Sequence, residues 1–92
     1  MLTGITQNIL RKMCDFAGIE YGCVNWSDGS HLQLTWTKQQ QNDFTDWLAN
    51  EINNSALIRR NLTRFPNLVK GKYRSMRLAR EFVANYGFRV LN

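Results

Sequence analysis

The N-terminal stretch repeats its apolar residues at every third or fourth position, at Ile5, Ile9, Met13 and Phe16. This spacing predicts a helix over residues 4–17, because positions three and four apart share one helix face. Thr3 is its expected N-cap. Gly18 is placed to end the helix in a left-handed conformation.

Polar and apolar residues then alternate strictly over residues 31–36, which is the period of a half-buried strand. We expect residues 19–26 to pair with this segment as an antiparallel hairpin, because the Asp-Gly pair at 28–29 suits a two-residue type I′ turn. That register puts Trp26 beside His31 on one face. Trp26, with His31 beside it, is a candidate contact residue if this face is open, and Trp26 is a core residue if the first helix covers it.

Helical periodicity returns after the hairpin. Thr37 and Gln40 form a Thr-x-x-Gln capping box at the start of a second helix. Its apolar face consists of Phe44, Trp47, Leu48 and Ile52. A break at 53–55 precedes a short third helix, which must end near Arg64 because the residue before Pro66 avoids the helical region.

A loop over residues 66–71 leads to a last helix over about 72–86, with Gly87 as its expected C-terminal stop. Residues 88–91 fit either a third strand of the hairpin or a docked tail. The sequence therefore predicts a single α+β domain over residues 1–92. Its expected order is an N-terminal helix, a two-stranded antiparallel hairpin and three helices.

Charge divides the chain into an acidic and a basic part. Residues 1–58 carry three basic and six acidic side chains, whereas residues 59–92 carry nine basic side chains and one acidic one. Arginine binds phosphates and carboxylates through a planar, bidentate fork, so the basic part predicts a binding face for an anionic partner. A solvated surface without a partner is the alternative. The residues of the predicted basic face are Arg59, Arg60, Arg64, Lys70, Lys72, Arg74, Arg77 and Arg80.

Residues suited to catalysis are sparse. His31 is the only histidine, and the hairpin register puts it on the solvent face without a nucleophile beside it. Cys14 and Cys23 lack the spacing of a metal site or a redox pair. We therefore expect no catalytic residue, no metal, no cofactor and no small-molecule substrate. No signal segment precedes the first helix and no apolar run reaches about 18 residues, so we expect a cytoplasmic protein that does not contact membranes.

Two segments resemble small accessory proteins encoded by tailed bacteriophages. They are LTWTKQQQNDFTDWL at residues 34–48 and NYGF at residues 85–88, and the similarity spans about residues 34–92. The resemblance implies a protein that binds and redirects a machine of the host cell, and it assigns no functional residue.

Three functions remain open at this point. The first is the inhibition or modulation of a host nucleic-acid-processing or defence complex, such as a nuclease or a CRISPR-type complex. The second is direct, largely nonspecific binding of DNA or RNA. The third is a structural or assembly role in a virion.

Overall fold

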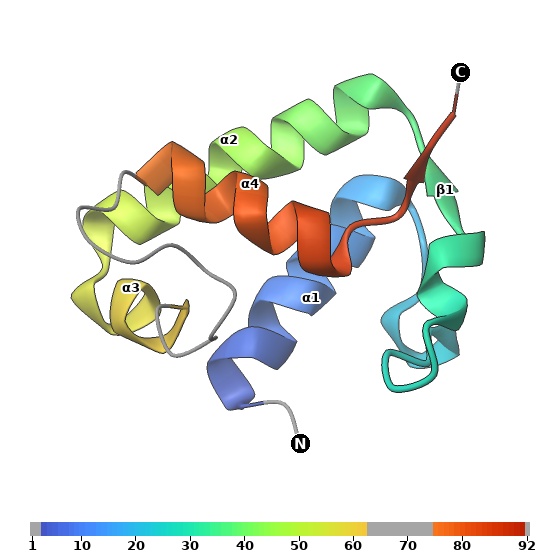
Figure 1. Cartoon of the computed structure of the whole chain (residues 1–92), viewed down its shortest axis with the longest axis horizontal. Coiled ribbons are helices and arrows are strands. Elements are labelled where there is room, and N and C mark those ends of the chain that lie inside the picture. The colour runs from blue at the N-terminus through green and yellow to red at the C-terminus, as the bar shows by residue number, and fades with distance from the viewer. Residues whose placement is uncertain (1–2, 63–74, 92) are drawn as a thin grey trace.

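The computed structural model describes residues 3–62 and 75–91, and most of these residues are helical. The predicted α+β class is therefore wrong, because the described residues form four α-helices and only a minimal two-stranded sheet. In chain order the elements are α1 (Gly4–Ala17), η1 (Tyr21–Cys23), η2 (Ser30–Gln33), β1 (Thr35–Trp36), α2 (Lys38–Asn54), α3 (Ala56–Leu62), α4 (Ser75–Tyr86) and β2 (Arg89–Val90), where η marks a 3-10 helix (Figure 1).

The ends of the first two helices confirm the predicted caps. Thr3 Oγ1 accepts a hydrogen bond from the Thr6 backbone N–H at 3.1 Å, and Gly18 ends α1 with a φ of 71°. At the start of α2, Thr37 Oγ1 accepts from the Gln40 N–H at 3.0 Å. The Gln40 side chain in turn accepts from the Thr37 N–H at 2.7 Å. Side chains thus satisfy backbone donors that a helix N-terminus leaves unpaired.

The predicted antiparallel hairpin does not form, because the segment between residues 19 and 34 satisfies its backbone locally. Asn25 Oδ1 accepts from the Ser27 N–H at 3.1 Å, and Asp28 Oδ1 accepts from the Ser30 N–H at 2.9 Å. Such turns compete with strand pairing. A type I′ turn also needs a positive φ at two residues, and in this turn only Gly29 has one.

The sheet instead joins segments that are far apart in the sequence. β1 pairs with β2 in parallel, with Thr35 opposite Arg89 and Trp36 opposite Val90. The Arg89 N–H donates to the Leu34 carbonyl at 2.9 Å, and the Leu91 N–H donates to the Trp36 carbonyl at 2.8 Å. The C-terminal segment is therefore a strand, as one prediction for residues 88–91 had it, but its partner and its direction differ.

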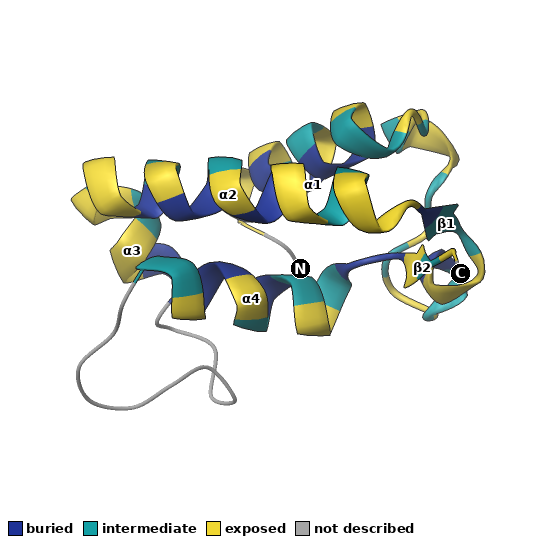
Figure 2. Ribbon diagram, turned by 90° about the horizontal axis from the view of Figure 1, so that it is seen from above, coloured by how far each residue is buried: buried dark blue, intermediate teal, exposed yellow. Residues whose placement is uncertain are grey.

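The core lies between α2 and the two helices that pack on it, α1 and α4. Figure 2 shows the buried faces of α2 and α4 turned toward each other. The Phe44 ring occupies the centre, at 5.9 Å from the Trp36 ring and 6.4 Å from the Phe82 ring. The largest fully buried side chains around it are Leu10, Met13, Leu48, Ile52, Leu62 and Leu78.

Gly87 ends α4 for a steric reason and not through a left-handed φ, which among the described glycines only Gly18 and Gly29 have. A Cβ atom at Gly87 would lie 2.5 Å from the Val83 carbonyl oxygen. The chain can therefore turn directly from α4 into Phe88. The Phe88 ring packs edge-on against Trp36 at 5.3 Å and anchors β2.

The predicted loop at 66–71, the end of the third helix and the first turn of the last helix lie outside the described residues.

Candidate functional site

Two arginines of the predicted basic face lie together on the outer side of α4. Arg77 and Arg80 are both exposed. They are three positions apart and therefore neighbours on the helix surface. The opposite side of α4 is buried through Leu78, Ala79 and Phe82. The amphipathic pattern of the helix thus determines which way the two guanidinium groups point.

A groove of about 430 Å³ separates this side of α4 from α2. Its lining consists of Lys38, Gln41, Asn42 and Thr45 from α2, and of Arg80, Val83 and Ala84 from α4. We call this groove the basic groove, because Lys38 and Arg80 are its charged residues and no carboxylate lines it.

The side chains determine the electrostatics of the basic groove. The two helices run antiparallel (Figure 1), so the partial positive charge at the start of α2 and the partial negative charge at the end of α4 offset each other. Among the described residues, no hydrogen bond or salt bridge engages the charged groups of Lys38 and Arg80. The Thr45 hydroxyl donates to the Gln41 carbonyl at 2.7 Å and is thereby turned toward its own helix.

The chemistry of this lining favours anions. Lysine and arginine donate charged hydrogen bonds, and the amides of Gln41 and Asn42 add neutral donors. Phosphate and carboxylate groups are the acceptors that such a set recognises.

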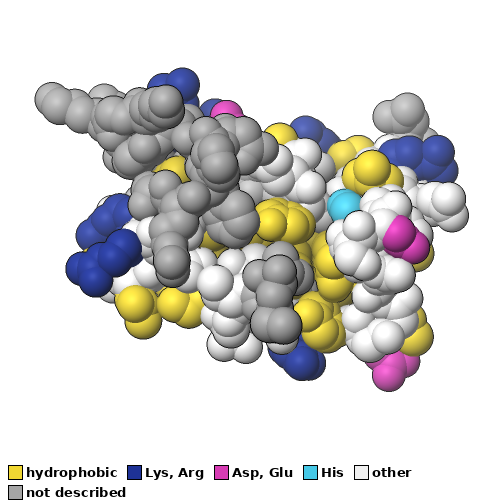
Figure 3. Space-filling view, turned by 60° about the horizontal axis from the view of Figure 1, so that its bottom comes forward, with side chains coloured by type: hydrophobic (Ala, Val, Ile, Leu, Met, Phe, Trp, Pro, Cys, Tyr) yellow, Lys and Arg dark blue, Asp and Glu magenta, His cyan; other side chains and the backbone are white. Residues whose placement is uncertain are grey.

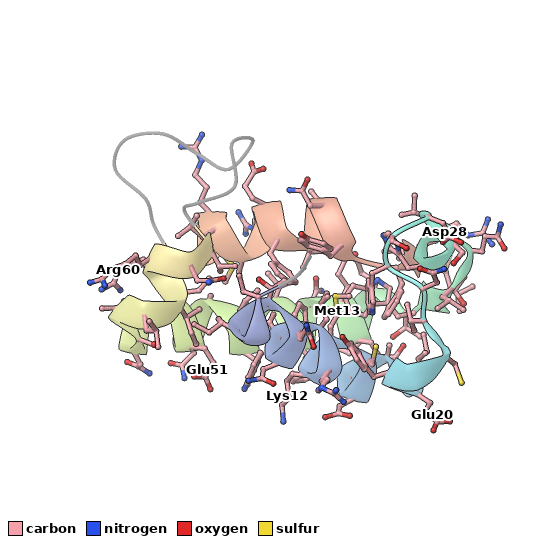
Figure 4. All side chains as sticks on the ribbon, turned by 90° about the horizontal axis from the view of Figure 1, so that it is seen from below. Lys12, Met13, Glu20, Asp28, Glu51 and Arg60 are labelled. Atoms are coloured by element: carbon pink, nitrogen blue, oxygen red, sulfur yellow. The ribbon has the colours of Figure 1, made fainter. Side chains whose placement is uncertain are left out.

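The arginines of α3 lie elsewhere. Arg59 and Arg60 belong to the end of the molecule opposite β1, and neither lines the basic groove (Figures 1 and 4). The Arg59 Nη1 donates to the Ile52 carbonyl at 2.9 Å, so this side chain caps the last turn of α2. The structure therefore does not unite α3 and α4 in one binding face.

The remaining members of the predicted face, Arg64, Lys70, Lys72 and Arg74, lie outside the described residues. On the uncovered parts of the face drawn in Figure 3, cationic side chains occupy separate places, including the end that carries α3 and the opposite end. Positive charge is thus dispersed on this side of the molecule.

Trp26 and His31, the predicted hairpin contacts, pack against each other with ring centroids 5.3 Å apart. The Trp26 ring also lies 5.8 Å from the Phe88 ring. His31 is only 7% exposed, which corrects its expected place on a solvent face. Both ring nitrogens of His31 and the Trp26 Nε1 are buried without a hydrogen-bond partner. This pair therefore forms the interior of the η1–η2 segment.

The loop beside this pair is held by its own polar side chains. The hydrogen bond from the Ser30 backbone N–H holds the pKa of the Asp28 carboxyl below its usual value. The Asn25 amide donates to the other Asp28 oxygen at 3.2 Å. Asp28 is therefore a structural residue of this loop.

The sequence prediction missed Lys38, Gln41 and Asn42. The division into an acidic and a basic part assigned Lys38 to the acidic part, and the two amides carried no charge signal. The helical period predicts that these residues share one side of α2. It does not predict that this side lies next to Arg80.

The described residues thus define a small helical protein with a cationic groove between two antiparallel helices. In this part of the chain no group of three or more His, Cys, Asp or Glu side chains is arranged to hold a metal ion. None of the described helices has the length and apolar character needed to cross a membrane. Comparison of the chain with protein-family models, curated proteins and solved structures finds no match.

Proposed function

We propose that the protein acts by binding and that its basic groove, together with Arg77, attaches it to a host nucleic-acid-processing or defence complex. Binding there inhibits or modulates the complex. One observation carries this proposal: Lys38 and Arg80 line a groove without a carboxylate. Arg77 is exposed on α4, three positions before Arg80. The resemblance to small phage proteins supplies the class of partner.

The burial of His31 and Cys14 supports binding over catalysis. His31 is buried and packs against the Trp26 ring, and burial raises the pKa of the Cys14 thiol to about 11. A general base or a nucleophile needs access to a substrate and a suitable pKa. Both side chains are buried and lack this access.

A second candidate function is direct binding of DNA or RNA through phosphate groups. The donors of the basic groove favour it, because phosphate oxygens accept hydrogen bonds from lysine, arginine and amide groups alike. This binding weakens steeply with salt, with a log–log slope of about −0.9 per neutralised phosphate on duplex DNA.

The test of the leading proposal compares two double variants with the same change in charge. Arg77→Glu/Arg80→Glu reverses the charge of Arg80, which lines the basic groove, and of its neighbour Arg77 on α4. Arg11→Glu/Arg89→Glu reverses two exposed cations elsewhere. The tagged parent protein should recover a bacterial complex with nuclease or polymerase activity and change that activity. The first variant should lose both effects and the control should keep them. Equal loss in the two variants, or full binding by the first, contradicts the proposal.

Gel-shift titration of the purified protein at two salt concentrations separates the second candidate. A salt-sensitive shift of bare duplex DNA that disappears in Arg77→Glu/Arg80→Glu supports direct nucleic-acid binding. The absence of any shift, with recovery of a host complex, supports the leading proposal. Open-ended assemblies in light scattering instead indicate a virion assembly role.

A further inference from the structure

A second groove, of about 270 Å³, lies on the other side of α2. Its lining consists of Ile5, Asn8, Ile9 and Lys12 from α1, Trp47 and Glu51 from α2, and Ile58 from α3. We call it the apolar groove, because four of these seven side chains are large and apolar.

The apolar groove has a buried floor and open walls. Ile9 at its floor is fully packed, whereas Ile5, Trp47 and Ile58 are only half-buried. Leu57, next to Ile58 on α3, is 61% exposed. A single exposed leucine is ordinary on a protein surface. Here the next residue along α3, Ile58, lines a groove with apolar walls, and exposed apolar surface near such a groove is typical of protein contact sites.

The two charged residues of the groove have opposite signs. The Lys12 Nζ lies 5.6 Å from the centroid of the Trp47 ring. Glu51 is one helical turn beyond Trp47 on α2. Figure 4 shows the Lys12 and Glu51 side chains at the same edge of the molecule, on the side away from α4. The groove therefore presents apolar walls, a cation and an anion, and α3 carries an exposed leucine next to the groove residue Ile58.

We propose that a second copy of this chain occupies the apolar groove in a two-fold symmetric dimer. In this dimer Leu57 of each copy enters the groove of the other, and Lys12 of each copy faces Glu51 of the other. A two-fold interface must be complementary to itself. This surface meets that requirement twice, through the leucine and the groove, and through the two opposite charges.

The location of the remaining charge fits the same occupant. The chain carries a net charge of +5, so two copies repel each other wherever their cations meet. The apolar groove contains one lysine and one glutamate, while Arg77 and Arg80 lie on α4, which does not line it. A dimer formed here therefore keeps Arg77 and Arg80 out of the interface. Arg59 and Arg60 are exposed beside Leu57 on α3, and Arg59 is already engaged with the Ile52 carbonyl. This inference does not depend on the proposed function.

The first test compares Leu57→Glu with Leu32→Glu, since Leu32 is 58% exposed and lies on η2. Sedimentation equilibrium over a range of concentrations should show a monomer–dimer equilibrium for the parent and for Leu32→Glu. Leu57→Glu should remain monomeric, with a parent-like circular dichroism spectrum. A monomeric parent at every concentration, or equal behaviour of the two variants, overturns the proposal.

A second test uses the charges and does not require any change to Leu57. Lys12→Glu places two like charges opposite each other in each homodimer, and so does Glu51→Lys, so each variant alone should dimerise at least about tenfold more weakly than the parent. In a mixture of the two variants every pair is again opposite in sign, and heterodimers should form with parent-like affinity. Contacts within a single chain cannot restore dimerisation in this way, because neither variant carries both substitutions. A mixture that dimerises no better than its components overturns the proposal.

Discussion

Replacement of His31 by leucine should stabilise the protein. Both imidazole nitrogens are buried and form no hydrogen bond. A buried polar group without a partner costs about 1–3 kcal/mol. Leucine has a similar volume and no polar atoms, so it removes this cost without leaving a cavity.

The loss of one aromatic contact sets the lower end of the expected gain. The His31 ring packs 5.3 Å from the Trp26 ring, and aromatic pairs contribute about 0.5–1.5 kcal/mol beyond their buried area. Subtraction of this loss from the cost of the unpaired imidazole leaves an expected gain in the free energy of unfolding of about 1 kcal/mol, and of about 2.5 kcal/mol at most. For a domain of this size each kcal/mol raises the melting temperature by about 4–8 °C.

Urea unfolding followed by circular dichroism measures this change. His31→Gln serves as the control, because its side chain is again polar and should bring no gain. If the leucine variant unfolds at a lower urea concentration than the parent while the glutamine variant unfolds at the same concentration as the parent, the imidazole is hydrogen-bonded. The cost assigned to the two nitrogens would then be wrong.

The other stability predictions concern one glycine and the two cysteines. Gly87→Ala should destabilise the protein by about 1–3 kcal/mol in urea unfolding, because its Cβ would lie 2.5 Å from the Val83 carbonyl oxygen, whereas Gly4→Ala meets no atom within 4 Å. Iodoacetamide should label the exposed Cys23 of the native protein and leave Cys14 unlabelled until urea is added, as mass spectrometry can show. Burial raises the pKa of the Cys14 thiol from 9.0 to about 11, so its contribution to stability is complete below pH 9 and is lost as the pH rises toward 11. Cys14→Ala should make this alkaline loss smaller.

The helices were predictable where their signals are short-range. The cap at Thr3 acts on an N–H three residues away, and the capping box of α2 spans four residues, from Thr37 to Gln40. An apolar stripe with such a boundary specifies a helix before any tertiary contact forms.

The strand pairing was predicted wrongly because short-range signals do not determine it. Alternation at residues 31–36 indicated a strand, yet the Leu34 N–H bonds the His31 carbonyl within a 3-10 turn. The strand partner of β1 lies more than fifty residues away, at Arg89 and Val90. No local pattern encodes such a pairing, and the polar side chains of the 25–30 loop provide the backbone with nearer partners.

The candidate site was predictable only in part. Arg77 and Arg80 followed from the helical period and from charge. Lys38 becomes a neighbour of Arg80 only through the antiparallel packing of α2 on α4. Arg59 had the same sequence signal as Arg80, but it caps the end of α2 with its guanidinium group. Charge in a sequence locates cations without showing which of them are already engaged within the fold.

The positions of the two grooves on α2 connect the two proposals. At about 100° per residue, Trp47 and Glu51 lie roughly half a turn around α2 from Lys38 and Asn42, so a partner in one groove leaves the other open. The proposed dimer therefore presents two basic grooves at a fixed separation. Two linked sites bind an extended polyanionic partner more tightly than either does alone, by about 10²–10⁴ where the geometry permits both contacts. Leu57→Glu should thus weaken binding of a long polyanion such as heparin, although Leu57 is not part of the basic groove. Its affinity for inorganic phosphate should not change. Equal losses for both ligands would mean that the substitution damages the basic groove itself.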